Sequence, residues 1–160
     1  MARDKVPATP AIRELKKHKV KFTPRPYKYE DKGGTRTSAR ELQVEEHIVI
    51  KTLVMEDDQQ RPLIVLMHGD CEVSLKHLAR QLGVKKVAPC KPERADQLTG
   101  YQTGGISPFG LRQPLPIYME ESIKILDKLI INGGKRGLIV ELAVTDLIKI
   151  LTPTTVSVAI

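Results

Sequence analysis

Apolar residues follow two different spacings along this chain of 160 residues. Two runs rich in β-branched residues, at 47–55 and 61–68, predict strands, and the polar residues 56–60 between them predict a hairpin turn. Apolar residues three or four positions apart predict amphipathic helices at 10–19 and 74–82. Shorter patterns predict further strands at 84–87, 115–118, 129–131, 138–142 and 154–160, and further helices at 92–97, 120–128 and 145–151.

Capping residues mark where these helices begin and end. Thr9, which a proline follows, predicts the start of the first helix. Ser74 predicts the start of the amphipathic helix that ends at Gly83. The capping-box pattern at 38–41 predicts another short helix, and Thr145 predicts the start of the last one. Strands and helices therefore follow one another in no regular order, which predicts an α/β fold with a mixed, partly barrel-like sheet flanked by helices. We expect residues 1–160 to form one domain.

The net charge of +7 is concentrated near the N-terminus. Residues 1–40 hold 12 Lys and Arg against 4 Asp and Glu, whereas the other residues hold 14 against 15. Such a field attracts a polyanion, although a solvated helix face explains the charge equally well. The basic residues concerned are Arg13, Lys16, Lys17, Lys19, Lys21, Arg25 and Lys28.

Targeting and redox signals are few. Residues 1–5 lead into no apolar segment, and no stretch approaches the ~20 apolar residues of a membrane span, so we expect a cytoplasmic protein without a membrane partner. Cys71 and Cys90 form neither a CxxC motif nor a cluster with histidine at metal-ligand spacing. We therefore expect free thiols, no metal and no cofactor. The histidines, which we expect at the surface, are His18, His47, His68 and His77.

Residues 99–110, with the sequence TGYQTGGISPFG, have the composition of a ligand-binding loop. Gly104 and Gly105 allow the backbone to approach a ligand closely, and the hydroxyl side chains around them suit an ester or a phosphate. Ser107 is not a serine-hydrolase nucleophile, because Pro108 after it has no N–H for an oxyanion hole. The Walker A pattern is also missing. A structural turn between strands is the alternative interpretation.

Other candidate ligand contacts lie outside this loop. Lys51 interrupts an apolar strand, so it either covers apolar surface with its stem at a solvent face or points into a cleft where an anionic or polarised ligand offsets its desolvation. Lys135 and Arg136, between glycines, form a compact cationic loop that suits a phosphate or is a polar turn. The tyrosines that suit stacking on a base or binding an ester are Tyr27, Tyr29 and Tyr101.

Six motifs in this order resemble the YbaK family of aminoacyl-tRNA deacylases, which is similar to the editing domain of bacterial prolyl-tRNA synthetases. Each motif is weak alone, but together they span most of the chain. Within the family they are most similar to the free-standing Cys-tRNA(Pro) deacylases. The motifs are Thr9-Pro10-Ala11, Tyr27, Lys51-Thr52-Leu53, Leu75-Lys76-His77-Leu78-Ala79 with Leu82-Gly83, Thr99-Gly100-Tyr101 with Gly104-Gly105-Ile106-Ser107-Pro108, and Gly133-Gly134-Lys135-Arg136-Gly137-Leu138.

The resemblance implies trans-editing, in which cysteine or alanine is removed from the 3′ end of tRNA(Pro) by a hydrolase- or lyase-type deacylase without metal, cofactor or covalent enzyme nucleophile. It implies that Lys51 contacts the terminal nucleotide and the ester, and that aminoacyl-tRNA and prolyl-tRNA synthetase are partners. The predicted substrate-binding residues are Tyr27, Thr99, Gly100, Tyr101, Gly104, Gly105, Ile106, Ser107, Lys135 and Arg136. A non-catalytic module that binds tRNA or a synthetase is the alternative, and an interaction module without tRNA affinity is a third class.

One position departs from the family pattern. Ile139 stands where familiar members have an aspartate, and isoleucine cannot perform the role of an acid. Glu141, two residues further along a predicted strand, points to the same face and is a candidate substitute, although this acid also belongs to the family pattern.

Overall fold

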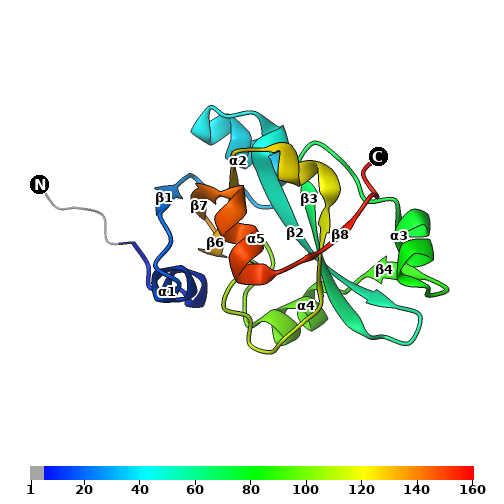
Figure 1. The fold of residues 1–160 in the computed structure, drawn as a ribbon. Coiled ribbons are helices and arrows are strands. Elements are labelled where there is room, and N and C mark those ends of the chain that lie inside the picture. The colour runs from blue at the N-terminus through cyan, green and yellow to red at the C-terminus, as the bar shows by residue number, and fades with distance from the viewer. Residues whose placement is uncertain (1–5) are drawn as a thin grey trace, which may run out of the picture.

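The predicted hairpin lies at the centre of a mixed eight-stranded sheet (Figure 1). The computed structural model describes residues 6–160, so the segment 1–5, in which we predicted no targeting signal, lies outside the described residues. The strands follow the order β1-β7-β6-β2-β3-β5-β8, and β4 also pairs with β2. Their bounds are β1 (Phe22–Pro26), β2 (Val49–Asp57), β3 (Pro62–His68), β4 (Val87–Pro89), β5 (Ile117–Glu120), β6 (Lys128–Lys135), β7 (Leu138–Ala143) and β8 (Thr154–Val156).

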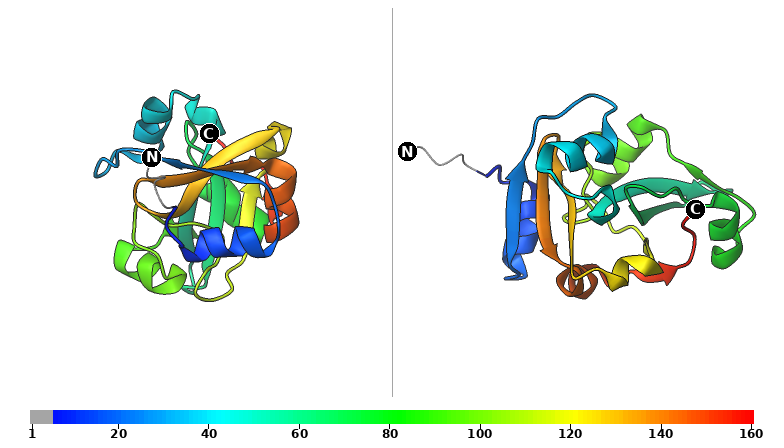
Figure 2. Two further views of the ribbon diagram at one scale, coloured as in Figure 1. Left: turned by 90° about the vertical axis from the view of Figure 1, so that its left-hand side faces the viewer. Right: turned by 90° about the horizontal axis from the view of Figure 1, so that it is seen from above.

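Within residues 6–160, five α-helices and two short 3₁₀ helices surround the sheet. In Figure 2, β6 and β7 run across the direction of β2 and β3, so the sheet is strongly bent, in agreement with the mixed, partly barrel-like fold that the sequence predicts. The helices are α1 (Pro10–Lys17), α2 (Gly34–Leu42), η1 (Glu46–Ile48), α3 (Leu75–Leu82), α4 (Pro92–Thr99), η2 (Glu121–Ile125) and α5 (Val144–Leu151).

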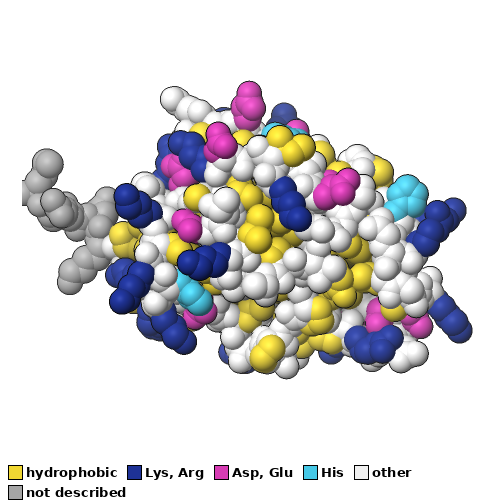
Figure 3. Space-filling view, in the orientation of Figure 1, with side chains coloured by type: hydrophobic (Ala, Val, Ile, Leu, Met, Phe, Trp, Pro, Cys, Tyr) yellow, Lys and Arg dark blue, Asp and Glu magenta, His cyan; other side chains and the backbone are white. Residues whose placement is uncertain are grey.

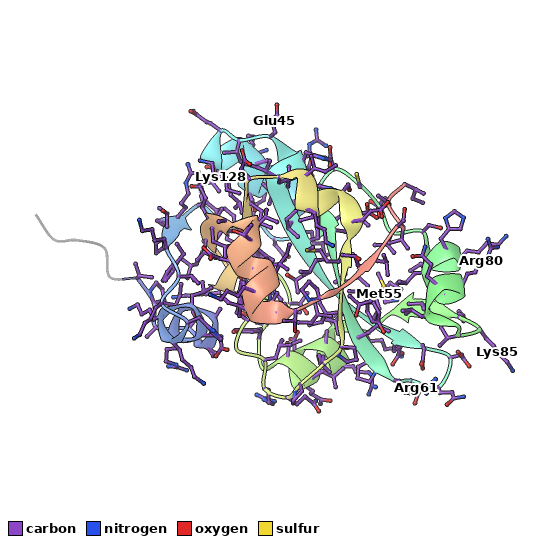
Figure 4. The ribbon with its side chains drawn as sticks, in the orientation of Figure 1. Glu45, Met55, Arg61, Arg80, Lys85 and Lys128 are labelled. Carbon is purple, nitrogen blue, oxygen red and sulfur yellow. The ribbon has the colours of Figure 1, made fainter. Side chains whose placement is uncertain are left out.

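Apolar side chains form three clusters around this sheet. The largest joins α1 and α5 to the bent sheet and includes Ile12 and Leu147, both fully buried. The second lies between α3 and the β2–β3 hairpin, where Met55 points into the interior while Arg61 and Arg80 project outward (Figure 4). The third lies beneath α2 and consists of Ala39, Val49, Ile130 and Ile139. Burial of these faces is the main favourable term in folding.

Local capping signals predicted two of the helices well. The Thr9 side chain accepts a hydrogen bond from the Ile12 N–H, at 3.1 Å, and the Ser74 side chain accepts one from His77 N–H. The helix that Ser74 caps ends at Gly83 with a φ of 70°, a left-handed conformation that glycine adopts readily.

Two predicted helix starts are wrong. Ser38 lies inside α2, where its hydroxyl donates to the Gly34 carbonyl, because the helix begins one turn earlier. The last helix begins at Val144 rather than after Thr145, since the Val144 N–H is satisfied by the Asp127 carbonyl instead of a side-chain cap.

Two other elements are shorter in the structure than the sequence predicts, because of tertiary contacts. The predicted helix at 120–128 is only the 3₁₀ helix η2, because Glu120 accepts hydrogen bonds from the N–H groups of Ser122, Val158 and Ala159 and ties this segment to the C-terminus. The predicted strand at 154–160 is limited to β8, apart from an isolated bridge between Val73 and Ala159. The strand predicted at 84–87 is shifted to β4.

The basic residues of the N-terminal segment gather at one end of the molecule, over α1 and β1 (Figure 3). Among the described residues, Arg13, Lys16, Lys17, Lys19 and Lys21 are exposed, so the charge faces solvent. None of the helices found in residues 6–160 is both long and apolar enough to cross a membrane.

Candidate active site

A cleft of about 570 Å³ opens beside the middle of β2. On this side of β2, β6 pairs only with Val49 and Ile50, and β4 pairs only from Met55 onward. The gap between these two neighbours leaves 51–54 without a strand partner on that edge in the described part of the chain. The cleft is lined by β2, by the start of α2, by the glycine loop, by the β6–β7 hairpin and by the segment before α4. Its lining includes Tyr27, Tyr29, Glu30, Asp31, Thr35, Lys51, Thr52, Cys90, Gly104, Ile106, Asn132, Arg136 and Ile139.

Lys51 lies at this unpaired edge, with 20% of its side chain exposed. Its ammonium donates a hydrogen bond to the Cys71 carbonyl, at 2.5 Å, and lies 3.9 Å from the Glu72 carboxylate. An ammonium has three N–H donors, so these contacts orient it and leave capacity for a ligand oxygen. Of the two interpretations of Lys51, the geometry supports the one that places it in a cleft.

The glycine loop is held against the β6–β7 hairpin by two hydrogen bonds, one from Asn132 and one from Arg136. The Asn132 side chain donates to the Gly104 carbonyl, at 3.1 Å, and accepts from the Gly134 N–H, at 2.7 Å. The Arg136 guanidinium donates to the Thr103 carbonyl, at 2.9 Å, and lies over the Tyr29 ring, 5.1 Å from its centroid. One wall of the cleft is therefore a fixed assembly of loop, hairpin and Tyr29.

Several predicted substrate contacts instead support the loop from behind. The Thr99 hydroxyl donates to the Ala95 carbonyl, and the Tyr101 hydroxyl donates to the Phe109 carbonyl, at 2.6 Å. Burial raises the pKa of Tyr101 to about 12. Ser107 is fully buried and accepts a hydrogen bond from the Phe109 N–H. Thr99, Tyr101 and Ser107 are not among the residues that line the cleft.

Of the other predicted substrate contacts, some line the cleft and some do not. Tyr27, Gly104, Ile106 and Arg136 line the cleft with Lys51. Gly100, which caps α4, Lys135, which is exposed at the end of β6, and Gly105, which is buried, do not line it. The Gly105 N–H bonds the Gln102 carbonyl, and an added Cβ there would lie 2.8 Å from the Arg136 backbone nitrogen. Gly105 is thus required for packing of the loop on the hairpin.

A sequence profile described as the aminoacyl-tRNA editing domain matches residues 31–150. The chain belongs to the aminoacyl-tRNA editing domain family. It is 33% identical over 136 residues, 84% of this chain and 83% of the relative, to an Enterococcus faecalis protein provisionally named the Cys-tRNA(Pro)/Cys-tRNA(Cys) deacylase EbsC. It is 24% identical to a proline–tRNA ligase of Limosilactobacillus reuteri over 137 residues, which are 77% of this chain and 24% of the ligase.

A solved structure confirms the fold of this editing domain. The structure, provisionally described as a trans-editing enzyme for prolyl-tRNA synthetase, superposes with a TM-score of 0.80 at 20% identity and covers 96% of this chain and 98% of its own. The resemblance drawn from the six sequence motifs is therefore confirmed. The segment with α1 and β1, which contains Tyr27, lies outside the residues that the family profile matches.

The position that departs from the family pattern forms an apolar part of the editing-domain cleft. Ile139 is 2% exposed and packs with Ala39 and Val49. Glu141 is not a substitute acid in the cleft, because Arg25, at 3.7 Å, and Lys128, at 2.9 Å, hold its carboxylate elsewhere.

The acids that do line this cleft come from the loop before α2. They are Glu30 and Asp31. Hydrogen bonds to the Glu30 carboxylate, first from Arg40 and then from Thr37, lower its pKa. Glu30 is therefore a carboxylate at neutral pH, and Arg40 orients it at the rim.

Some cleft residues escaped the sequence analysis because no motif marks them. Asn132 follows an apolar run and precedes the glycine pair, a position that gave no signal of its contact with the glycine loop.

Cys90 also lines the cleft. Burial, and then the nearby Glu56 carboxylate, raise the pKa of its thiol. A protonated thiol is a poor nucleophile, so Cys90 does not form a covalent intermediate readily at neutral pH.

Replacement of Ser107 by alanine is expected to lower stability and to leave the cleft chemistry within a few-fold of the wild-type rate. The lost hydroxyl leaves the buried Phe109 N–H without its acceptor, which costs roughly 1–3 kcal/mol of unfolding free energy. Urea unfolding and deacylation assays of Ser107→Ala measure the two effects. Ser74→Ala, which removes a helix cap remote from the cleft, is the matched control. Complete loss of turnover at wild-type stability would restore Ser107 as a reacting group.

Proposed function

We propose that this chain is a free-standing trans-editing deacylase that hydrolyses the ester of cysteine mischarged on tRNA(Pro), with residues 1–160 acting as one editing domain. The observation that carries the proposal is that Lys51 and Gly104 line the same cleft. A cation and a glycine loop on one cleft suit the terminal ribose and the aminoacyl ester, which are polar and small. The name of the Enterococcus faecalis relative supports cysteine as the amino acid.

The proposed mechanism assigns positioning and polarisation to the protein. Lys51 donates a hydrogen bond to the ester region and stabilises the charge that develops on the carbonyl oxygen in the transition state. The cysteine thiolate of the substrate attacks its own ester carbon, the bond from that carbon to the ribose oxygen breaks, and the ribose oxygen takes up a proton. Water then opens the cyclic thioester to release cysteine. No enzyme nucleophile is needed, because the attacking group is held beside the ester.

The exposed basic surface over α1 and β1 supports aminoacyl-tRNA as the partner, since phosphate contacts by lysine and arginine supply most of the non-specific affinity for nucleic acid. Prolyl-tRNA synthetase is the proposed protein partner, because it produces the mischarged tRNA, and both partners require a cytoplasmic location. Binding should therefore weaken steeply as the salt concentration rises.

A side-by-side deacylation assay on tRNA(Pro) charged with cysteine, serine, alanine or proline tests this function. We expect Cys-tRNA(Pro) to be cleared far faster than Ser-tRNA(Pro), because a hydroxyl is a much poorer nucleophile than a partly ionised thiol. Equal rates on cysteine and serine would refute the substrate-assisted route, and a preference for Pro-tRNA(Pro) would refute editing. Salt-dependent tRNA binding with no release of any amino acid would establish the non-catalytic alternative, with Ile139 as its explanation.

A further inference from the structure

Three side chains with metal-binding atoms meet where η1 approaches the turn after β3. They are His47, Asp70 and Cys71, and one donor atom from each lies within 4.8 Å of the others. The His47 Nδ1 atom lies 2.8 and 3.1 Å from the two Asp70 carboxylate oxygens, and the Cys71 Sγ atom lies 3.5 Å from one of them. None of the three lines the cleft.

The fully buried residue His68 holds the two segments that carry these donors, against the prediction that all four histidines lie at the surface. Its ring stacks on that of His47, with centroids 3.7 Å apart and planes 8° from parallel. Its Nδ1 atom bonds the His47 carbonyl, at 2.7 Å, and its Nε2 atom bonds the Ser122 hydroxyl, at 2.8 Å. The His68 carbonyl accepts from the Cys71 N–H. The His68 ring therefore fixes the segment of His47, and the His68 backbone carbonyl fixes that of Cys71.

We propose that His47, Asp70 and Cys71 bind one zinc ion or a similar borderline divalent ion. Nitrogen, oxygen and sulfur donors are the set that zinc accepts, with bonds of about 2.0–2.3 Å in a tetrahedral arrangement. Such an arrangement needs donors roughly 3.5 Å apart. The His47 and Asp70 side chains are 43% and 44% exposed, so small rotations close the present spacing and an ion reaches the site from solvent. Water completes the fourth position.

The surrounding charge suits a divalent cation. A carboxylate and a thiolate offset the charge of the ion, and the nearby Lys51 ammonium is itself accompanied by the Glu72 carboxylate. The ion takes the place of the proton that His47 and Asp70 now share in their hydrogen bond. The position is therefore already polar.

The site has a physical connection to the cleft. The Cys71 carbonyl accepts the hydrogen bond of the Lys51 ammonium, so an ion on the Cys71 sulfur immobilises the peptide that orients Lys51. This consequence for turnover rests on the proposed function, whereas ion binding itself does not.

Titration of the metal-free full chain with Co²⁺, and a matched titration with Zn²⁺, tests the site without an activity assay. We expect one equivalent of either ion, a thiolate-to-cobalt charge-transfer absorption, and a rise in Tm with ion concentration. Cys71→Ser should abolish the absorption, and His47→Ala and Asp70→Asn should each weaken zinc binding at least about tenfold.

Two matched variants make the result specific. Cys90→Ser removes the other thiol and His77→Ala removes an exposed histidine on α3, and both should bind cobalt as the wild type does. Circular dichroism of each variant shows whether the fold is kept.

Two results would overturn the site: a cobalt charge-transfer absorption that persists in Cys71→Ser, or no binding of either ion by the wild type. The cluster would then be only a hydrogen-bonded pair at the surface. A deacylase that binds no ion refutes only this site, and an ion-binding protein without deacylation refutes only the proposed function.

Discussion

Replacement of Lys51 by alanine is expected to lower the deacylation rate of Cys-tRNA(Pro) by roughly 10²–10³-fold, the usual effect of removing one donor that stabilises transition-state charge. Lys51 lies on the part of β2 that lines the cleft, and the Cys71 carbonyl fixes the direction of its ammonium. Lys51→Met keeps an apolar stem and removes only the charge, so it should lose as much activity as Lys51→Ala. Single-turnover rates at saturating enzyme measure the effect on the chemical step.

A strand lysine outside the cleft serves as the control. Lys128 begins β6, pairs with Glu141 and does not line the cleft. Lys128→Ala should therefore deacylate at close to the wild-type rate. Undiminished turnover by Lys51→Ala would remove Lys51 from the reaction.

Gly104→Ala is expected to reduce turnover by about 100-fold, the effect of misplacing a reacting group by about 1 Å. The residue has a φ of +91°, which side chains other than glycine rarely adopt, and an added Cβ would lie 2.6 Å from the Tyr29 hydroxyl and 3.2 Å from the Arg136 Nε atom. The methyl group therefore displaces the wall that Tyr29 and Arg136 form, in addition to narrowing the ligand's approach. Deacylation and thermal unfolding are measured together.

Gly83→Ala separates backbone strain from displacement of the wall. Gly83 has a φ of +70° at the end of α3, and an added Cβ would meet nothing within 4 Å. It should lose stability through the strained backbone but deacylate at nearly the wild-type rate. Equal activity losses in both variants would show that general destabilisation, and not the cleft wall, explains the result.

Local signals determined much of this protein directly from the sequence. The β2–β3 hairpin follows from two apolar runs with a polar break, and the first turns of α1 and α3 follow from Thr9 and Ser74. These features depend on residues close in the chain, so periodicity and capping chemistry suffice to predict them. The motifs around Lys51 and the glycine loop also indicated the family, which the editing-domain profile over residues 31–150 confirms.

Only the tertiary structure decided which of the predicted residues face the cleft. The cleft exists because β6 and β4 cover different ends of β2, and this depends on sheet order rather than on any local pattern. Tyr101 and Ser107 are buried, and their hydroxyls form hydrogen bonds within the loop, whereas Gly104 lines the cleft. Hydroxyls in a loop have the same sequence signature in either position, because their partners come from the folded backbone.

The histidines show the same division. His47 is 23 residues from Asp70 in the chain, and the two meet only because β2 and β3 pair antiparallel and bring their ends together. His68 ends β3 and is buried by the residues that η1 and η2 place over it. The sequence by itself determined the β2–β3 hairpin, the starts of α1 and α3 and the family, which rest on local pattern. Only the fold shows that His47, Asp70 and Cys71 meet, and which loop residues line the cleft and which support the loop from behind. Both depend on contacts between residues far apart in the chain.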